Sequence, residues 1–141
     1  MINRANPLRV LLVDDENYMR VFVGRVLSGV ISCTIAEARD GQDAIEQCAK
    51  VDPELVILDI NMPRVDGLQA LSEIRARQPD VPIIMLTSIS EEVVVEKCVN
   101  KGASFFIRKD VGANVLKAEL EEVVRQFFPN PKPTDERPTA T

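Results

Sequence analysis

Short apolar runs alternate along the chain with longer segments in which apolar residues recur every three or four positions. The short runs predict five strands, at residues 9–14, 33–36 and 55–58, from Val81-Pro82 onward, and at residues 104–107. The longer segments predict five helices, at residues 17–27 and 42–50, from Leu68 to a stop before Gln78-Pro79, from a Ser90 cap to about Lys101, and at residues 113–128. This alternation predicts an α/β fold, in which a doubly wound, five-stranded parallel sheet is covered on both faces.

The helical pattern also predicts which side chains face the core. In the helix at residues 17–27, Arg20 and Arg25 fall opposite the apolar positions, so we expect both on the solvent face. Val115 of the last helix falls among the apolar positions and is expected in the core. Asp66-Gly67, just before the third helix, is interpreted as turn chemistry.

Polar residues with reactive side chains stand at the ends of four predicted strands. Asp14 and Asp15 end the first strand, Asp59 follows the third, Thr87 the fourth and Lys109 the fifth. The carboxyl ends of parallel strands meet at one edge of a sheet, where ligands of such folds bind. We therefore expect these side chains to form one site.

The chemistry of this site suits phosphoryl transfer with a divalent cation. Two carboxylates about 4 Å apart repel by about 4 kcal/mol at an effective dielectric constant of about 20, so Asp14, Asp15 and Asp59 need a positive partner. Oxygen donors without nearby nitrogen or sulfur ligands favour Mg²⁺, which keeps coordination positions open for a phosphate. Asp59 would be the nucleophile, with Lys109 and the Thr87 hydroxyl holding phosphoryl oxygens.

Length and composition bound the domain organisation. With 141 residues, 45% of them hydrophobic, the chain is long enough for one domain with a full core and too short for two. We expect a flexible lead-in at residues 1–8, the domain at residues 9–128, and a proline-rich disordered tail or linker at residues 129–141. The three cysteines are widely spaced among apolar neighbours, which favours packed thiols over a disulfide or metal cluster.

Charge and histidine content argue against several classes of function. The 17 basic and 22 acidic residues give a net charge of −5 without a basic stripe, which argues against direct nucleic-acid binding. No apolar run approaches the roughly 20 residues of a membrane span, and residues 1–9 lack a signal-peptide core, so we expect a cytoplasmic protein with no membrane partner. Because histidine is absent, Ser-His-Asp catalysis, histidine-ligated zinc and a phosphohistidine donor within the chain are excluded.

The residues at the strand ends together resemble the receiver domain of two-component response regulators. The resemblance covers about residues 8–128 and rests on Asp14-Asp15, Asp59 within Asp-Ile-Asn-Met-Pro-Arg-Val-Asp-Gly, Thr87-Ser88, and Phe106 three residues before Lys109. It implies a (βα)5 flavodoxin-like fold of the chemotaxis-receiver type, with strand order 2-1-3-4-5.

The resemblance also implies roles for the acids and the lysine. Asp59 would accept a phosphoryl group from a sensor histidine kinase, a phosphotransfer protein or a small phosphodonor. Asp15, Asp59 and the backbone carbonyl of Asn61 would bind Mg²⁺, with Asp14 assisting through water. Lys109 would pair with the phosphoryl group.

Thr87 and Phe106 are the switch residues that the resemblance implies. Thr87 would move toward the phosphoryl group and Phe106 would turn inward behind it, reshaping the face of the fourth helix, fifth strand and fifth helix. A downstream protein, or an output domain if the chain belongs to a longer regulator, would bind that face. The domain would be a signalling phosphoacceptor and not an enzyme, apart from self-phosphorylation by small donors and loss of its own phosphoryl group.

One residue departs from the family pattern. Receiver domains usually have proline after the lysine, often with a cis peptide bond, whereas this chain has Lys109-Asp110. A cis bond before a residue other than proline costs about 2.5–4 kcal/mol, so we predict a trans bond here. We expect Asp110 to point toward solvent.

Two other functions share part of this residue set. A haloacid-dehalogenase-like phosphatase also uses Asp, Thr, Lys and Mg²⁺, but its Asp-x-Asp motif comes first, and Asp59-Ile60-Asn61 lacks the second acid. A non-phosphorylated binding module would keep the fold alone, which the complete set of acids, Thr87 and Lys109 disfavours. The sequence leaves open the kinase, the output target, the oligomeric state and dimerisation on phosphorylation.

Overall fold

The computed structural model describes residues 2, 4–60, 67–87 and 92–129. Across these residues five strands and five helices alternate, as the hydrophobic pattern predicts. Their bounds are β1 (Leu8–Val13), α1 (Asn17–Ser28), β2 (Cys33–Ala38), α2 (Gly41–Val51), β3 (Leu55–Asp59), α3 (Gly67–Arg77), β4 (Ile83–Thr87), α4 (Glu92–Asn100), β5 (Phe105–Arg108) and α5 (Ala113–Phe127).

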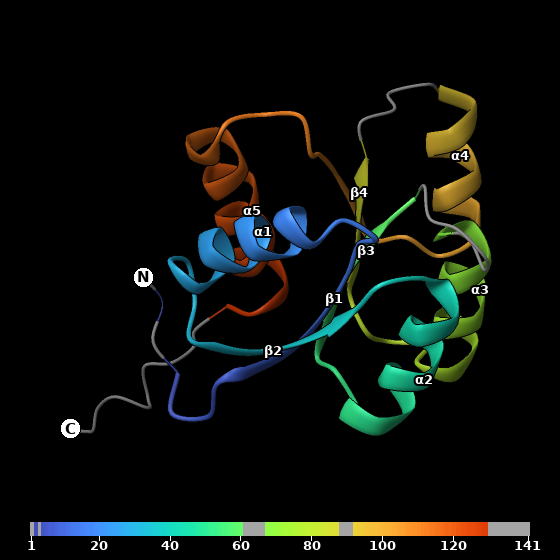
Figure 1. The fold of residues 1–141 in the computed structure, drawn as a ribbon, viewed down its shortest axis with the longest axis horizontal. Helices are drawn as coiled ribbons and strands as arrows, with labels where there is room; N and C mark the ends of the chain where they lie inside the picture. Colours follow the sequence, from blue (N-terminus) through green and yellow to red (C-terminus); the bar gives the residue numbers. More distant parts are fainter. Residues whose placement is uncertain (1, 3, 61–66, 88–91, 130–141) are drawn as a thin grey trace.

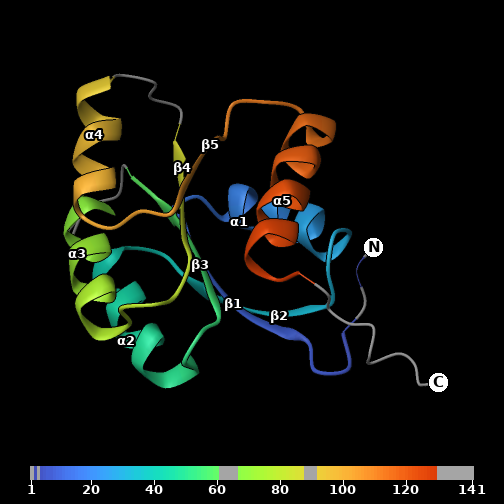
Figure 2. The same ribbon diagram turned by 180° about the vertical axis from the view of Figure 1, so that it is seen from behind.

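The strands form one parallel sheet in the order β2-β1-β3-β4-β5, which confirms the predicted fold and strand order. Helices α1 and α5 cover one face of this sheet, and α2, α3 and α4 cover the other (Figure 1, Figure 2). The winding changes direction between β1 and β3. The carboxyl ends of these two strands therefore flank the position at which doubly wound sheets bind ligands.

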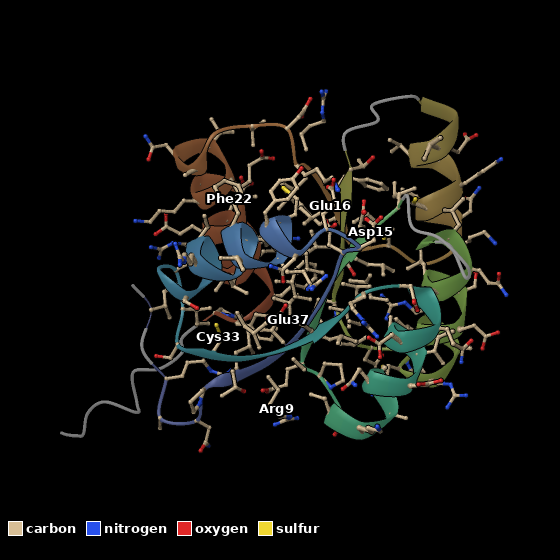
Figure 3. All side chains as sticks on the ribbon, viewed as in Figure 1. Arg9, Asp15, Glu16, Phe22, Cys33 and Glu37 are labelled. Atoms are coloured by element: carbon tan, nitrogen blue, oxygen red, sulfur yellow. The ribbon has the colours of Figure 1, made fainter. Side chains whose placement is uncertain are left out.

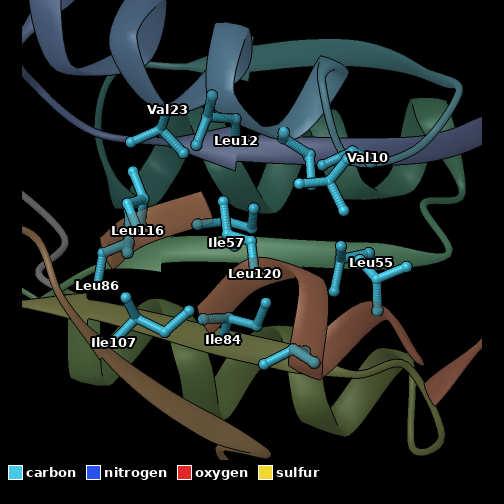
Figure 4. Close-up of a cluster of buried hydrophobic side chains, with 14 of the residues drawn as sticks. Val10, Leu12, Val23, Leu55, Ile57, Ile84, Leu86, Ile107, Leu116 and Leu120 are labelled. Carbon is cyan, nitrogen blue, oxygen red and sulfur yellow. The ribbon is translucent and has the colours of Figure 1, made fainter. Parts of the chain in front are cut away.

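Each face of the sheet has its own hydrophobic core because successive residues of a strand point to opposite faces. In β1, Val10 and Leu12 belong to the core under α1 and α5, whereas Leu11 and Val13 belong to the core under the other helices. Figure 4 shows the first of these clusters. Burying each such side chain contributes about 1.5–3 kcal/mol, and a one-residue slip of a strand would move its side chains to the wrong face. The two cores therefore fix the register of the strand ends.

The first residues make contacts that the sequence pattern did not predict. The Ile2 N–H donates a hydrogen bond to the Val30 carbonyl (2.6 Å), and the Ser32 N–H donates to the Ile2 carbonyl (2.8 Å). Ile2 thus forms an isolated parallel bridge with Ile31, and Leu8 belongs to β1 instead of preceding it. Part of the expected lead-in is tied to the sheet.

Helix α5 shows one error in the predicted core. Val115 is 50% exposed, whereas its neighbour Leu116 and, one turn later, Leu120 are fully buried. Each residue of an α-helix is turned by about 100° from the last, and the buried face of α5 is formed by Leu116, Leu120, Val123 and Val124. Val115 is turned from Leu116 toward the side away from Leu120 and Val124, so it falls outside this face.

Candidate functional site

Three carboxylates lie together at the carboxyl ends of β1 and β3. Asp14 is 1% exposed and Asp59 is 2% exposed, whereas Asp15 is exposed to solvent. One oxygen atom from each acid lies within 4.8 Å of the other two. Figure 3 shows Asp15 beside the ends of both strands. The structure thus brings the three acids together as the sequence predicts.

Strand pairing explains why these acids meet. Val13 pairs with Leu58 in the register of β1 and β3, so the next residues of the two strands, Asp14 and Asp59, come side by side. The Asp14 N–H donates a hydrogen bond to the Ala38 carbonyl (3.1 Å), which continues the pairing with β2 beyond the end of β1. Both neighbouring strands therefore hold the acid pair at the edge of the sheet.

Lys109, just after β5, reaches across to this cluster. Its Nζ lies 3.1 Å from Asp14 Oδ2, 3.3 Å from Asp59 Oδ2 and 3.7 Å from Glu16 Oε1. Burial lowers the pKa of Lys109, but the attraction of Asp59 and Asp14 outweighs it, so this pKa is raised above its ordinary value of 10.5. The amine is therefore charged at neutral pH and offsets part of the acids' negative charge.

The ionised form of Asp14 is costly in this environment. Burial raises the pKa of Asp14 above its ordinary value of 3.8, although a hydrogen bond from the Glu16 N–H (2.9 Å) and the charge of Lys109 act in the opposite direction. A buried carboxylate with a raised pKa lowers the free energy of unfolding at neutral pH. A bound cation would offset this cost, and three carboxylate oxygens suit a hard divalent cation such as Mg²⁺.

Thr87 occupies the adjacent strand end. It is the last residue of β4 and is 3% exposed. Because Asp59 pairs with Leu86, Thr87 lies one residue farther along its own strand. The Thr87 carbonyl accepts a hydrogen bond from the Lys109 N–H (3.0 Å), which ties the ends of β4 and β5 together. All the strand-end residues predicted from the sequence therefore share one edge of the sheet.

The two phenylalanines of β5 point to opposite sides of the sheet. Both are half-buried: Phe106 packs against the core under α2, α3 and α4, as does Val94 of α4, whereas Phe105 packs against the core under α1 and α5. The alternation of side chains along a strand accounts for this difference. Phe106 therefore lies on the side of the sheet that α4 covers.

Residues 10–121 match the family described as Response regulator receiver domain. The chain belongs to this family. It is 34% identical over 118 residues to the chemotaxis protein CheY of Listeria monocytogenes, an alignment that covers 84% of this chain and 99% of that protein.

Solved receiver structures have a similar fold. The response regulator domain of Thermotoga maritima CheB superposes with a TM-score of 0.76 at 30% identity, covering 86% of this chain and 96% of that chain. The CheX-CheY-BeF3-Mg²⁺ complex from Borrelia burgdorferi gives a TM-score of 0.77 at 29% identity, covering 86% and 90%. Receiver domains are signalling phosphoacceptors that bind Mg²⁺ in an acidic pocket and interact with histidine kinases and downstream effectors. The family match disfavours the phosphatase alternative.

The departure from the receiver pattern has the predicted geometry. The peptide bond between Lys109 and Asp110 is trans. Asp110 is exposed and its carboxylate accepts hydrogen bonds from Arg108 Nε (3.0 Å) and Nη2 (2.6 Å). This pairing with Arg108 holds the additional acid on the solvent-exposed side of the chain.

Gly67 is a site residue whose role the sequence interpretation missed. A Cβ atom at this position would overlap the Asp59 carbonyl oxygen and would lie 2.6 Å from Ile60 Cα. The Gly67 N–H donates a hydrogen bond to the Ile60 carbonyl (3.0 Å). Glycine is therefore required for the start of α3 to approach the backbone that carries Asp59. In the sequence, Asp66-Gly67 cannot be distinguished from an ordinary turn signal.

The prediction that Arg20 faces solvent is wrong. Its side chain is only 9% exposed, whereas Arg25 on the same helix is exposed as predicted. Helical spacing separates apolar from polar residues, but it does not show whether other elements supply hydrogen-bond acceptors that allow a guanidinium to be buried. Arg20 has such acceptors, and one of them belongs to the acid pair.

Of the receiver motif, residues 61–66, Asn61 among them, and Ser88 lie outside the described residues. The role of the Asn61 carbonyl as a metal ligand therefore stays a prediction. Among the described residues, no helix combines the length and the apolar character that crossing a membrane requires.

Proposed function

We propose that this receiver is switched by a phosphoryl group on Asp59, taken from a sensor histidine kinase, a phosphotransfer protein or a small phosphodonor. The observation that carries the proposal is the placement of the Asp59 carboxylate. It is 2% exposed, lies at a strand end among two further acids, and has the Lys109 amine 3.3 Å away. Preorganised positive charge beside an oxygen nucleophile is what phosphoryl transfer requires.

The transfer step uses an oxygen of Asp59. A carboxylate oxygen attacks the donor phosphorus, and the new O–P bond forms as the P–N bond of phosphohistidine breaks. The leaving imidazole keeps the electron pair and then takes a proton from water. Because this chain has no histidine, a phosphohistidine donor belongs to another protein. Lys109 would hold a phosphoryl oxygen and so disperse its charge.

Asp15, Asp59 and the Asn61 carbonyl are the proposed Mg²⁺ ligands, with Asp14 acting through water. The clustering of three carboxylate oxygens fits this hard cation, as does the presence of Mg²⁺ in the similar Borrelia complex. When bound, Mg²⁺ would supply positive charge that offsets the repulsion among the acids and the transferred group.

Thr87 and Phe106 are the proposed switch residues, acting on the face of α4, β5 and α5. The Lys109 N–H hydrogen bond to the Thr87 carbonyl supports this proposal because it joins the phosphoryl-binding residue to the strand end beside it. A downstream protein, or an output domain of the same regulator, would bind the altered face. Family membership supports action in the cytoplasm, where soluble kinase domains transfer phosphoryl groups.

Incubation with acetyl phosphate and Mg²⁺, followed by intact-mass measurement, tests the proposal. Wild type should gain about 80 Da, the mass of one phosphoryl group, and Asp59→Asn should gain nothing. Asp110→Asn, which alters an exposed acid beside the same edge, is the matched control and should gain the same mass as wild type. Donor turnover without an adduct would indicate a phosphatase, and no reaction would indicate a non-phosphorylated binding module. Light scattering on the same samples would show whether phosphorylation causes dimerisation.

A further inference from the structure

Arg20 makes three side-chain hydrogen bonds that converge on the end of β1. Its Nη1 donates to the Asp14 carbonyl oxygen (2.7 Å), its Nε donates to Glu37 Oε1 (2.6 Å), and its Nη2 donates to Asn17 Oδ1 (3.1 Å). Burying a guanidinium is costly unless its donors are paired in good geometry. The paired acceptors belong to the residue after β1, to β2 and to the first turn of α1, so one side chain joins three parts of the fold beside the acid cluster.

The hydrogen bond from Arg20 to the Asp14 carbonyl fixes the orientation of a peptide group. This carbonyl belongs to the peptide group between Asp14 and Asp15, and a peptide group is planar from one Cα atom to the next. Its orientation therefore fixes the direction in which the chain leaves Asp14 and enters Asp15. The Asp14 N–H is held on the other side by Ala38 (3.1 Å). That bond fixes the preceding peptide group, and Arg20 fixes the next one, between Asp14 and Asp15.

We propose that Arg20 is a positioning residue for the cation site, an inference that rests on the proposed function. It acts through the backbone: the guanidinium holds the peptide plane between Asp14 and Asp15 and thereby sets where their carboxylates lie relative to Asp59. Glu37 of β2 orients the guanidinium in turn. Arg20 touches neither the phosphoryl group nor the cation.

Arginine is suited to this task and lysine is not. The guanidinium has five donors in a rigid plane, so it can bind the Asp14 carbonyl, Glu37 and Asn17 at once, whereas an ammonium group on a flexible stem cannot reproduce that arrangement. Arg20→Lys keeps the charge of the site and removes the fixed geometry. The Arg20→Lys variant therefore distinguishes an effect of geometry on the cation site from an effect of the positive charge.

The test is a Mg²⁺ titration of the full chain in the absence of a phosphodonor. Tyr18 is the only tyrosine and there is no tryptophan, so tyrosine emission reports one residue, whose hydroxyl lies 3.3 Å from Glu16 Oε2 beside the site. Removing residues that orient metal ligands typically weakens metal affinity about 10–100-fold, and we expect a loss in this range for Arg20→Lys. At saturating Mg²⁺ the rate of phosphorylation by acetyl phosphate should recover to near that of wild type.

Two further variants make the result decisive. Glu37→Gln leaves the Asp14 bond in place but loosens the guanidinium, so a smaller loss of Mg²⁺ affinity is expected. Arg75→Lys is the structural control, because Arg75 also binds backbone carbonyls, those of Gly102 (2.7 Å) and Pro79 (2.9 Å), away from the acids. It should lower the melting temperature and leave Mg²⁺ affinity unchanged.

Each outcome bears on the inference. Wild-type Mg²⁺ affinity in folded Arg20→Lys would overturn it, as would equal losses of affinity in Arg20→Lys and Arg75→Lys. If Arg20→Lys does not fold, Glu37→Gln decides, and unchanged affinity in that variant overturns the inference. Absence of Mg²⁺ binding in wild type would instead overturn the proposed function, and this inference with it.

Discussion

Charged side chains have opposite effects on stability at the two ends of the sheet. At the carboxyl end, the buried acids Asp14 and Asp59 lie beside the Lys109 amine, and within the described part of the chain the acids Asp14, Asp15 and Asp59 outnumber it. At the amino end, the guanidinium of Arg75 donates to backbone carbonyls, including that of Gly102 (2.7 Å), where a helix end needs a donor. The acid cluster lowers the free energy of unfolding, whereas the hydrogen bonds of Arg75 raise it.

This contrast shows which end of the sheet is built for stability and which for a ligand. Like charges in a buried cluster lower the free energy of unfolding, so they persist where a bound group offsets them. Donors paired with helix-end carbonyls need no ligand. The carboxyl end should therefore respond to Mg²⁺ and to pH, and the amino end to neither.

The largest expected effect is steric and lies at the carboxyl end. Gly67→Ala would press a Cβ against the backbone of Asp59 and Ile60, which cannot move without disturbing β3. We expect a loss of about 3 kcal/mol or more in the free energy of unfolding, measured by urea denaturation, together with loss of phosphorylation.

Gly24→Ala is the matched control for that substitution. A Cβ at Gly24 would meet Ile35 at 3.5 Å and Leu12 at 3.8 Å, which are ordinary van der Waals contacts. Because alanine favours helix, this variant should be more stable by about 0.5–1 kcal/mol. Equal losses in both variants would show that the close approach at Gly67 is not the cause.

Removing the amine from the carboxyl end should have the next largest effect. Lys109→Met removes the ammonium group that lies 3.1 Å from Asp14 and 3.3 Å from Asp59, and breaking a buried pair costs about 3–5 kcal/mol. Since Lys109 is 15% exposed, we expect about 2–3 kcal/mol in urea denaturation without Mg²⁺. Added Mg²⁺ should restore more stability to this variant than to wild type. Lys101→Met, at an exposed lysine, should change stability by less than about 0.5 kcal/mol.

At the amino end, Arg75→Ala should cost about 2 kcal/mol, because the carbonyls of Gly102 and Gln78 lose a charged donor. The loss in the free energy of unfolding should be the same with and without Mg²⁺ and between pH 5 and pH 8. A loss that Mg²⁺ reverses would contradict the division between the two ends.

Removing the charge of Asp14 should have a smaller effect than these losses, and of the opposite sign. Asp14→Asn keeps an acceptor for the Glu16 N–H and removes a buried charge, so we expect a gain of about 1 kcal/mol at pH 7 without Mg²⁺. A raised pKa in the folded state means that protonation stabilises wild type below pH 3.8, and this stability is lost as the pH rises through the raised value. The advantage of the variant over wild type should therefore grow from pH 4 to pH 7, while its Mg²⁺ affinity falls.

The sequence was sufficient to predict the fold and the membership of the acid cluster. Apolar runs identified the strands, and parallel strands bring their carboxyl ends to one edge regardless of details, so Asp14, Asp59, Thr87 and Lys109 had to lie near one another. The trans bond before Asp110 followed from the energy of a single peptide bond.

What the sequence could not show were contacts that depend on three-dimensional packing. Gly67 looks like a turn residue until α3 is seen against Ile60, and Arg20 looks like a surface residue until its acceptors are in place. These features arise where two elements meet, and a pattern along one element carries no information about its neighbour.

The hydrogen bond between the Lys109 N–H and the Thr87 carbonyl directly connects the backbones of the two residues proposed to hold and to sense the phosphoryl group. A displacement of either strand end would be transmitted to the other through this single backbone hydrogen bond. The effects of Lys109 and Thr87 substitutions on the free energy of unfolding should then not be additive, and the difference from additivity would measure the coupling between the two strand ends.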